Sequence, residues 1–212
     1  MKRTIDLATW SRREYYEFFG RMDNPYTGVV AEVDVTLLYQ HSKQAGDSFY
    51  LRYLHALMRA VNEVEELRCR IEQGQVVCHD RIHVEPTQAR PDGSFGFNYF
   101  PYDPSFKQFA ADAQADMAYV AAGSGLMLRK ENMESTDVVY FTVLPWVSFS
   151  ALAHPRCWGD NRGIVSMAVG KFHKVGERLM MPVQLQCHHG LADGYHMGRF
   201  YELAQQYFDE PF

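Results

Sequence analysis

Residues 186–194 read Gln-Cys-His-His-Gly-Leu-Ala-Asp-Gly, and they decide how the last part of the chain folds. The run 178–188, which leads into them, predicts a strand that ends at the histidine pair. The run 194–208, which continues from them, places Met197, Phe200 and other apolar residues on one face and predicts an amphipathic helix. A strand end that opens into a helix is a common position for functional residues in α/β folds.

Outward from this junction, strand and helix patterns alternate irregularly along the chain. Strands are expected over 29–38, 137–147 and 164–173, a hairpin over 69–83, and helices over 6–21, 49–67 and 104–120. Ser11 and Glu14 fit a capping box for the first helix, with Thr9 as the alternative cap. Residues 86–104 are rich in Pro, Gly and aromatics and are expected to be partly strand and partly loop. Because strands become adjacent late in the chain, we expect the α/β (α+β) class, a two-layer sandwich of helices packed on a mixed β-sheet.

Length and composition favour one globular domain over residues 1–212. A chain of 212 residues that is 47% hydrophobic buries a sizeable core, and this composition excludes a disordered chain. The net charge of −5 comes without a basic block, so the sequence lacks the electrostatic footprint of a nucleic-acid-binding protein. A single domain of this size is expected to form its cleft on one face or to share it with another subunit.

Targeting signals and cysteine usage point to the cytoplasm. Residues 1–19 contain no continuous apolar stretch, and no run of about 18 apolar residues occurs, so we expect neither a secretory signal nor a membrane span. The four cysteines are scattered without a C-x-x-C pair, which predicts reduced thiols rather than a disulfide framework or a zinc site. They are Cys69, Cys78, Cys157 and Cys187.

The pair His188-His189 contains the candidate catalytic residues of the quoted segment. Histidine is the side chain best suited to take and return a proton near neutral pH. The alternative is structural: both histidines end the strand and Asp193 caps the helix. A metal site is not expected, because adjacent strand residues point to opposite faces and cannot readily share one ion.

The wider pattern His-His-x-x-x-Asp-Gly, followed by Tyr195–Arg199, resembles the catalytic signature of the chloramphenicol acetyltransferase family. Further blocks resemble that family in the same order and spacing: Trp10–Glu14, Asp34–Thr36, Phe49-Tyr50 with Leu51 in place of a proline, Leu144–Phe149 and Gly176–Pro182. The blocks cover nearly the whole chain. The core His-x-x-x-Asp-Gly alone is shared with the wider superfamily of coenzyme A-dependent acyltransferases.

The resemblance implies transfer of an acetyl group from acetyl-CoA directly to a hydroxyl of chloramphenicol, with both substrates bound together and no covalent enzyme intermediate. It implies that His189 is the general base, with its near ring nitrogen bonded to its own backbone carbonyl. It implies that Ser148 stabilises the oxyanion and lies at the cofactor. Asp193 is expected to pair with Arg12 and to hold the histidine loop in shape.

The same resemblance implies a homotrimer with each active site at a subunit interface. Phe172 matches an aromatic residue near coenzyme A, where it either stacks on the cofactor or fills the core. The acceptor pocket is expected to involve Tyr26 or Thr27, Phe95 with its aromatic neighbours, and Ala168. No metal is expected. The segments 24–30 and 151–162 diverge from the family, so the chemistry matches better than the acceptor pocket.

Two alternative functions remain open from the sequence. The first is an O- or S-acetyltransferase of the same fold that acts on another small acceptor. The acyltransferase core of 2-oxo acid dehydrogenase complexes usually carries lipoyl and linker segments, which this short chain lacks, and peptide-synthetase condensation domains are about twice as long. The second is a non-catalytic binding protein on this scaffold, against which the retention of the four catalytic candidates argues.

Overall fold

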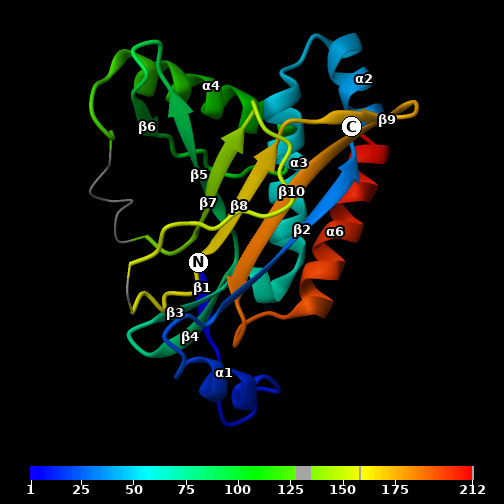
Figure 1. Ribbon diagram of the computed structural model, residues 1–212. Coiled ribbons are helices and arrows are strands. Elements are labelled where there is room, and N and C mark those ends of the chain that lie inside the picture. Colours follow the sequence, from blue (N-terminus) through cyan, green and yellow to red (C-terminus); the bar gives the residue numbers. More distant parts are fainter. Residues whose placement is uncertain (128–134, 158, 212) are drawn as a thin grey trace.

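A mixed β-sheet with helices on one face forms the body of the chain, as the computed structural model shows for residues 1–127, 135–157 and 159–211 (Figure 1). Across the sheet the strands are β2 (Tyr26–Asp34), β10 (Arg178–His188), β8 (Val165–Gly170), β7 (Val138–Leu144), β5 (His83–Ala89) and β6 (Phe95–Phe97), and β9 (His173–Val175) pairs with β10. β5, β7 and β8 run parallel, and their neighbours run antiparallel. The predicted mixed sheet is therefore confirmed.

A second, three-stranded sheet lies at one end of the molecule. It consists of β1 (Lys2–Thr4), β4 (Gln75–His79) and β3 (Cys69–Glu72), in that order. β3 and β4 are the predicted hairpin, and Gln73 and Gly74 adopt positive φ at its turn. Arg70 on β3 is fully buried and donates hydrogen bonds to the carbonyls of Thr136 and Val138, which ties the small sheet to the large one.

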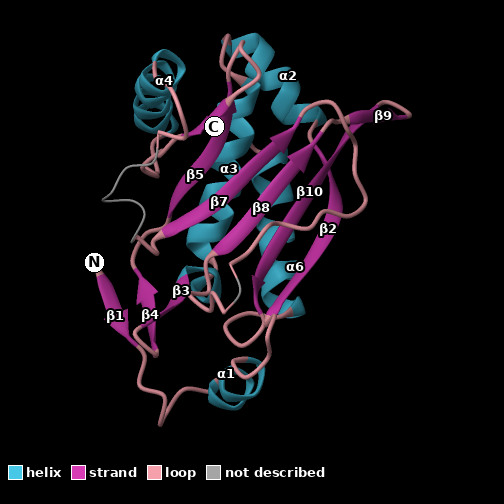
Figure 2. Cartoon of the chain, turned by 60° about the vertical axis from the view of Figure 1, so that its left-hand side comes forward, coloured by secondary structure: helices cyan, strands magenta, loops and turns pink. Residues whose placement is uncertain are grey.

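The helices of the described residues are α1 (Arg13–Phe19), α2 (Thr36–Ala45), α3 (Phe49–Glu63), the 3-10 helix η1 (Glu65–Arg68), α4 (Phe106–Ala122) and α6 (Gly194–Asp209). Figure 2 shows α2, α3 and α6 together behind the strands. Alternate residues of β10, such as Val183 and Leu185, bury their side chains against α3 and α6 in one core. This arrangement matches the periodicity from which α3 and α6 were predicted.

Two elements differ most from the sequence prediction. The expected strand over 29–38 ends at Asp34, because the Asp34 carboxylate accepts hydrogen bonds from the Thr36 amide (2.9 Å) and hydroxyl and thereby starts α2. The expected helix over 6–21 is only seven residues long. Its N-cap is Arg12, without a side-chain capping bond, so the Ser11–Glu14 capping box is not formed.

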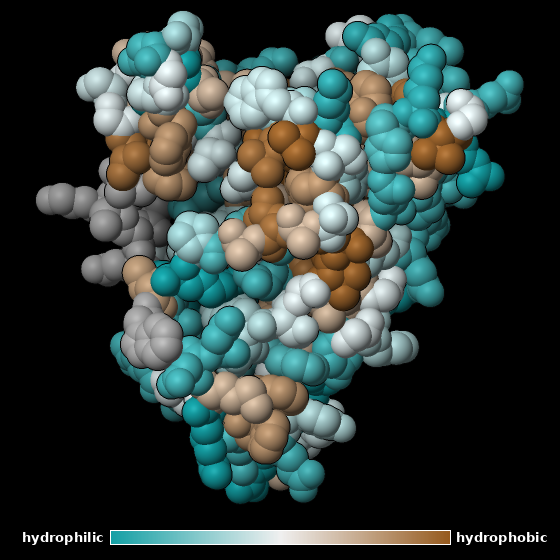
Figure 3. Space-filling model, viewed as in Figure 1, coloured by the Kyte–Doolittle hydropathy of each residue, from teal (hydrophilic) through white to brown (hydrophobic). Residues whose placement is uncertain are grey.

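The opposite face of the large sheet carries no helix among the described residues and is crossed by the segment 145–157 (Figure 1). Polar side chains of β10 anchor this segment. Gln184 bonds His154 and the carbonyl of Leu152, while Arg156 donates to Gln186. Figure 3 views this face and shows apolar patches between polar ones. This face of the sheet therefore carries polar side chains of β10, whereas the helix-covered face is apolar.

Candidate functional site

The loop from His188 to Asp193 joins β10 to α6 and is held by its own backbone. The amides of Leu191 and Ala192 both donate to the His188 carbonyl, at 2.9 and 3.0 Å. Asp193 is the N-cap of α6, and its carboxylate accepts from the Tyr195 amide at 3.0 Å. The amide of His189 donates to the carbonyl of Pro25 (2.8 Å). The loop is thus fixed to the residues before β2 and to the start of α6.

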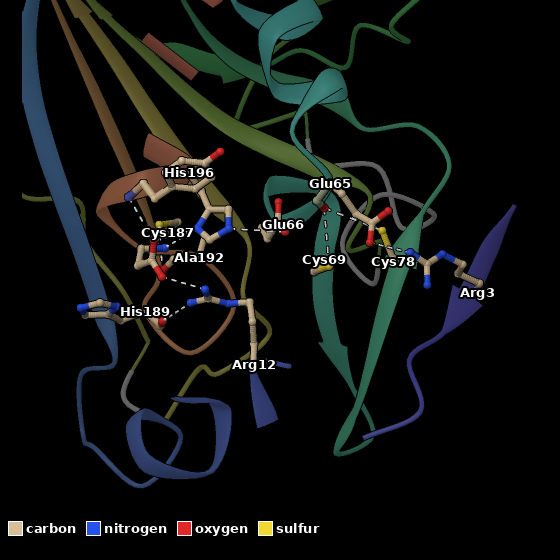
Figure 4. A network of polar contacts seen from close by, with 12 residues as sticks. Arg3, Arg12, Glu65, Glu66, Cys69, Cys78, Cys187, His189, Ala192 and His196 are labelled. Atoms are coloured by element: carbon tan, nitrogen blue, oxygen red, sulfur yellow. Dashed lines mark hydrogen bonds and ion pairs between the residues drawn. The ribbon is translucent and has the colours of Figure 1, made fainter. Parts of the chain in front are cut away.

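Arg12 and Asp193 meet across 181 positions of sequence, as the resemblance implied. Arg12 Nη1 lies 2.7 Å from Asp193 Oδ2, and Arg12 Nη2 donates to the His189 carbonyl at 3.4 Å (Figure 4). The Arg12 side chain is only 10% exposed. Burial raises the pKa of Asp193, but the hydrogen bond and charge of Arg12 outweigh it, and the net pKa lies below its ordinary value. The carboxylate therefore stays ionised and ties α1 to the histidine loop.

The ring of His189 stacks on Phe19 of α1, with centroids 4.0 Å apart and planes 12° apart. Its Nδ1 is buried without a hydrogen-bond partner in the described part of the chain, so the predicted bond to its own carbonyl is absent. That carbonyl accepts from Arg12 instead, and the stacking on Phe19 sets the plane of the ring. The role of Nε2 as the base stays a prediction.

His188 points the other way and is fully buried. Its Nδ1 accepts from the Gly190 amide at 3.1 Å, and the ring of Tyr26 packs on it edge-on. Burial, with the charges of Arg156 and His189, lowers the pKa of His188 to about 4. His188 is therefore neutral at pH 7 and supports the loop.

Ser148 and Phe172 lie together at the other end of the sheet. Ser148 is exposed after the end of β7, with its Oγ 3.4 Å from Nδ1 of His173. Phe172 packs against Tyr39 and Phe49. His173 pairs with Met180 near the start of β10, whereas His189 follows the end of that strand. At ~3.3 Å per strand residue, roughly 30 Å separates Ser148 from His189 within one chain.

The expected acceptor-pocket residues are dispersed in a single chain. Tyr26 lies beside His188 at one end of the sheet, and its hydroxyl accepts from the Gly163 amide (3.0 Å). Thr27 pairs with Cys187 and is directed to the helix side. Ala168 is fully buried in β8, and Phe95 is 47% exposed on the edge strand β6. Their part in acceptor binding stays a prediction.

Three side chains next to the site were missed by sequence reasoning: Phe19, which stacks on His189; Glu66, which approaches His196; and His173, which meets Ser148. Each makes its contact through tertiary packing. Only Phe19 could have been linked to the site from the sequence, because it lies on the same short helix that begins after Arg12.

The Arg12–Asp193 pair predicts a pH-dependent contribution to stability. Asp193→Asn removes the charge opposite a buried arginine, so we expect a loss of about 2 kcal/mol at pH 7. Because the folded pKa of Asp193 is lowered, this contribution is present above the unfolded value and is lost as pH falls through the folded one. The Tm difference from the parent protein, measured by calorimetry, should shrink below pH 4. Asp112→Asn, where the carboxylate accepts from the neutral Gln108, is the control and should show little difference at any pH.

Two further features concern membrane-spanning helices and metal ligands. No helix in the described ranges is long and apolar enough to cross a membrane. Likewise, no three His, Cys, Asp or Glu side chains of those ranges gather as metal ligands.

Comparisons with known proteins agree over the whole chain. The family model described as chloramphenicol acetyltransferase matches residues 2–205. Chloramphenicol acetyltransferases of Klebsiella sp and Staphylococcus aureus are 28% and 27% identical over 208 and 211 residues, covering 98% of this chain and 94% and 95% of their own. A solved structure described as chloramphenicol acetyltransferase is 30% identical with a TM-score of 0.91, covering 98% of this chain and 100% of that one.

A more distant structure shares the fold alone. Dihydrolipoamide acetyltransferase of Azotobacter vinelandii is 16% identical with a TM-score of 0.67, covering 90% of this chain and 84% of that one. The sheet and its helices thus form the fold of the coenzyme A-dependent acyltransferases. Together with the match over residues 2–205, this means that the chain belongs to the chloramphenicol acetyltransferase family.

Proposed function

We propose that this chain, acting as one domain over residues 1–212, transfers the acetyl group of acetyl-CoA to a hydroxyl of chloramphenicol. The observation that carries the proposal is the position of His189, in a loop held by the Arg12–Asp193 pair, in a chain of this family. The names of relatives called chloramphenicol acetyltransferase indicate the acceptor. The geometry of the loop indicates that His189 is the base.

The proposed chemistry needs one base and one hydrogen-bond donor. Acetyl-CoA, when bound, supplies the acetyl group as a thioester. Nε2 of His189 takes the proton of the acceptor hydroxyl, so that its oxygen forms a bond to the thioester carbonyl carbon. Ser148 donates a hydrogen bond to the carbonyl oxygen as it gains negative charge. As the carbon–sulfur bond breaks, His189 returns the proton to the sulfur of CoA.

We infer that each active site is built from two copies of the chain. The base and the oxyanion donor must both lie about 3 Å from one reacting group. Within one chain they are roughly 30 Å apart along β10, by strand geometry. A ring of three copies, in which the His189 end of one copy meets the Ser148 end of the next, satisfies both requirements. Exposed apolar side chains support contact at both ends: Phe18 is 62% exposed and Trp146 is 74% exposed.

The Ser148 end has the groups that acetyl-CoA requires. Phe172 offers a partly buried aromatic surface, continuous with Tyr39 and Phe49, on which an adenine ring can stack. Lys171 is exposed beside it and supplies positive charge for phosphate. Its amide donates to the Val147 carbonyl (2.8 Å), so it stays next to Ser148. We propose this edge as the cofactor surface, and the cytoplasm, where acetyl-CoA is found, as the location.

The proposal is tested by thiol release. The purified full chain with acetyl-CoA and a thiol reagent should release CoA only when chloramphenicol is added, and diacetylated chloramphenicol, which has no free hydroxyl, should release none. A panel of other small alcohols and thiols serves as comparison. Release that depends on another acceptor would overturn the drug assignment but keep the chemistry. Binding of either ligand without turnover on any acceptor would favour a non-catalytic protein.

A further inference from the structure

The imidazole of His196 lies between two carboxylates. Its Nδ1 is 2.8 Å from Asp193 Oδ1, and its Nε2 is 3.4 Å from Glu66 Oε1 (Figure 4). The His196 side chain is only 11% exposed, so these contacts are sheltered from water. His196 occupies the first turn of α6, three residues after the N-cap Asp193. The ring is thus clamped on both sides.

Glu66 belongs to the framework of the fold rather than to the histidine loop. It lies in η1, which follows α3 and is anchored by Leu67, a fully buried residue. From there a continuous series of contacts leads to the base. Glu66 approaches His196, His196 bonds Asp193, Asp193 pairs with Arg12, and Arg12 donates to the His189 carbonyl. The series connects the α3 framework to the backbone of His189.

We propose that Glu66 and His196 are positioning residues for the base His189, an inference that rests on the function proposed above. The Glu66 carboxylate fixes the orientation of the His196 ring. Nδ1 of this ring in turn bonds Oδ1 of Asp193, so that Oδ2 remains directed at Arg12. Arg12 then holds the His189 carbonyl in one place. Displacement of a reacting group by about 1 Å costs roughly 100-fold in rate, so this control of position affects turnover.

Glu65 provides a matched control, because it is the neighbouring residue in the same short helix. Its carboxylate pairs with Arg3 at 2.6 Å, and its side chain is 51% exposed. Its carbonyl accepts from the thiols of Cys69 and Cys78, away from His196 (Figure 4). Glu65→Gln removes the same charge from the same helix without touching the series that leads to His189.

The experiment compares Glu66→Gln, His196→Asn, their double variant and Glu65→Gln in the full chain. We expect Glu66→Gln and His196→Asn each to lower kcat about tenfold with KM for both substrates unchanged, since neither residue lies on the proposed substrate surfaces. The double variant should lose no more than the worse single variant, because both act through one series of contacts. Glu65→Gln should keep the parent kcat.

Three outcomes would overturn the inference: a parent-like kcat for Glu66→Gln, equal losses for Glu65→Gln and Glu66→Gln, or losses that multiply in the double variant. Thermal unfolding of each variant separates lost fold from lost rate, and if His196→Asn does not fold, the comparison of Glu65→Gln with Glu66→Gln decides. Turnover by a His189→Ala variant would instead overturn the proposed base itself. A parent-like Glu66→Gln beside an inactive His189→Ala overturns only the positioning role.

Discussion

His189→Ala is expected to lower kcat by roughly 10³- to 10⁴-fold, which is the upper part of the range for a general base. An alcohol is a poor nucleophile while it keeps its proton, and no other histidine can replace His189 in this position. The adjacent His188 is buried and directed to the other side of β10, with its pKa lowered to about 4. Stopped-flow or steady-state measurement of CoA release in the presence of chloramphenicol gives the rate.

Acetyl-CoA binding should survive this change, because the proposed cofactor contacts are made by Phe172 and Lys171 and none of them is assigned to His189. Equilibrium dialysis or calorimetry with CoA measures it. His189→Gln is a useful companion, since it fills part of the space on Phe19 but cannot take the proton. His41→Ala on α2 controls for loss of a histidine elsewhere. A near-normal rate for either His189 variant would refute the role of base.

The parts of the fold that the sequence predicts well are those with many buried positions in a regular period. α3 buries eight of its 15 residues, and its apolar spacing was legible from the sequence alone. α1 buries none, so its extent is set by contacts of Arg12 and Phe19 rather than by its own pattern. α2 was missed because the strand before it stops through the side chain of Asp34, a local hydrogen bond that periodicity does not register.

The candidate site also has parts that local sequence patterns predict and parts that only tertiary contacts determine. The strand, loop and helix that hold His189 and Asp193 were predictable from local pattern, and Arg12 was reached only through the family resemblance. Glu65 and Glu66 look equivalent in the sequence, yet one faces Arg3 and the other His196. Their difference depends on how the four-residue helix η1 is oriented, and the burial of Leu67 in the core helps to fix that orientation. The spacing of apolar residues in the sequence cannot tell two adjacent glutamates apart.

Chains that carry His189→Ala and chains that carry Ser148→Ala are expected to restore each other's activity. Each variant alone should be nearly inactive, the serine variant by roughly 10²- to 10³-fold as for other oxyanion donors. Light scattering should first give about three times 24.5 kDa for the parent protein. Co-expression with two different tags then isolates the mixed trimers by sequential purification.

In any mixed trimer the cyclic arrangement leaves one interface at which an intact His189 meets an intact Ser148. The mixed trimers should therefore show about one third of the parent kcat per trimer, from two chains that are inactive alone. Mixing His189→Ala chains with chains that carry both substitutions creates no intact interface and should restore nothing. If the first mixture stays as inactive as its parents, His189 and Ser148 do not work across an interface. The roughly 30 Å between them along β10 would then exclude Ser148 from the reaction of that chain's own His189.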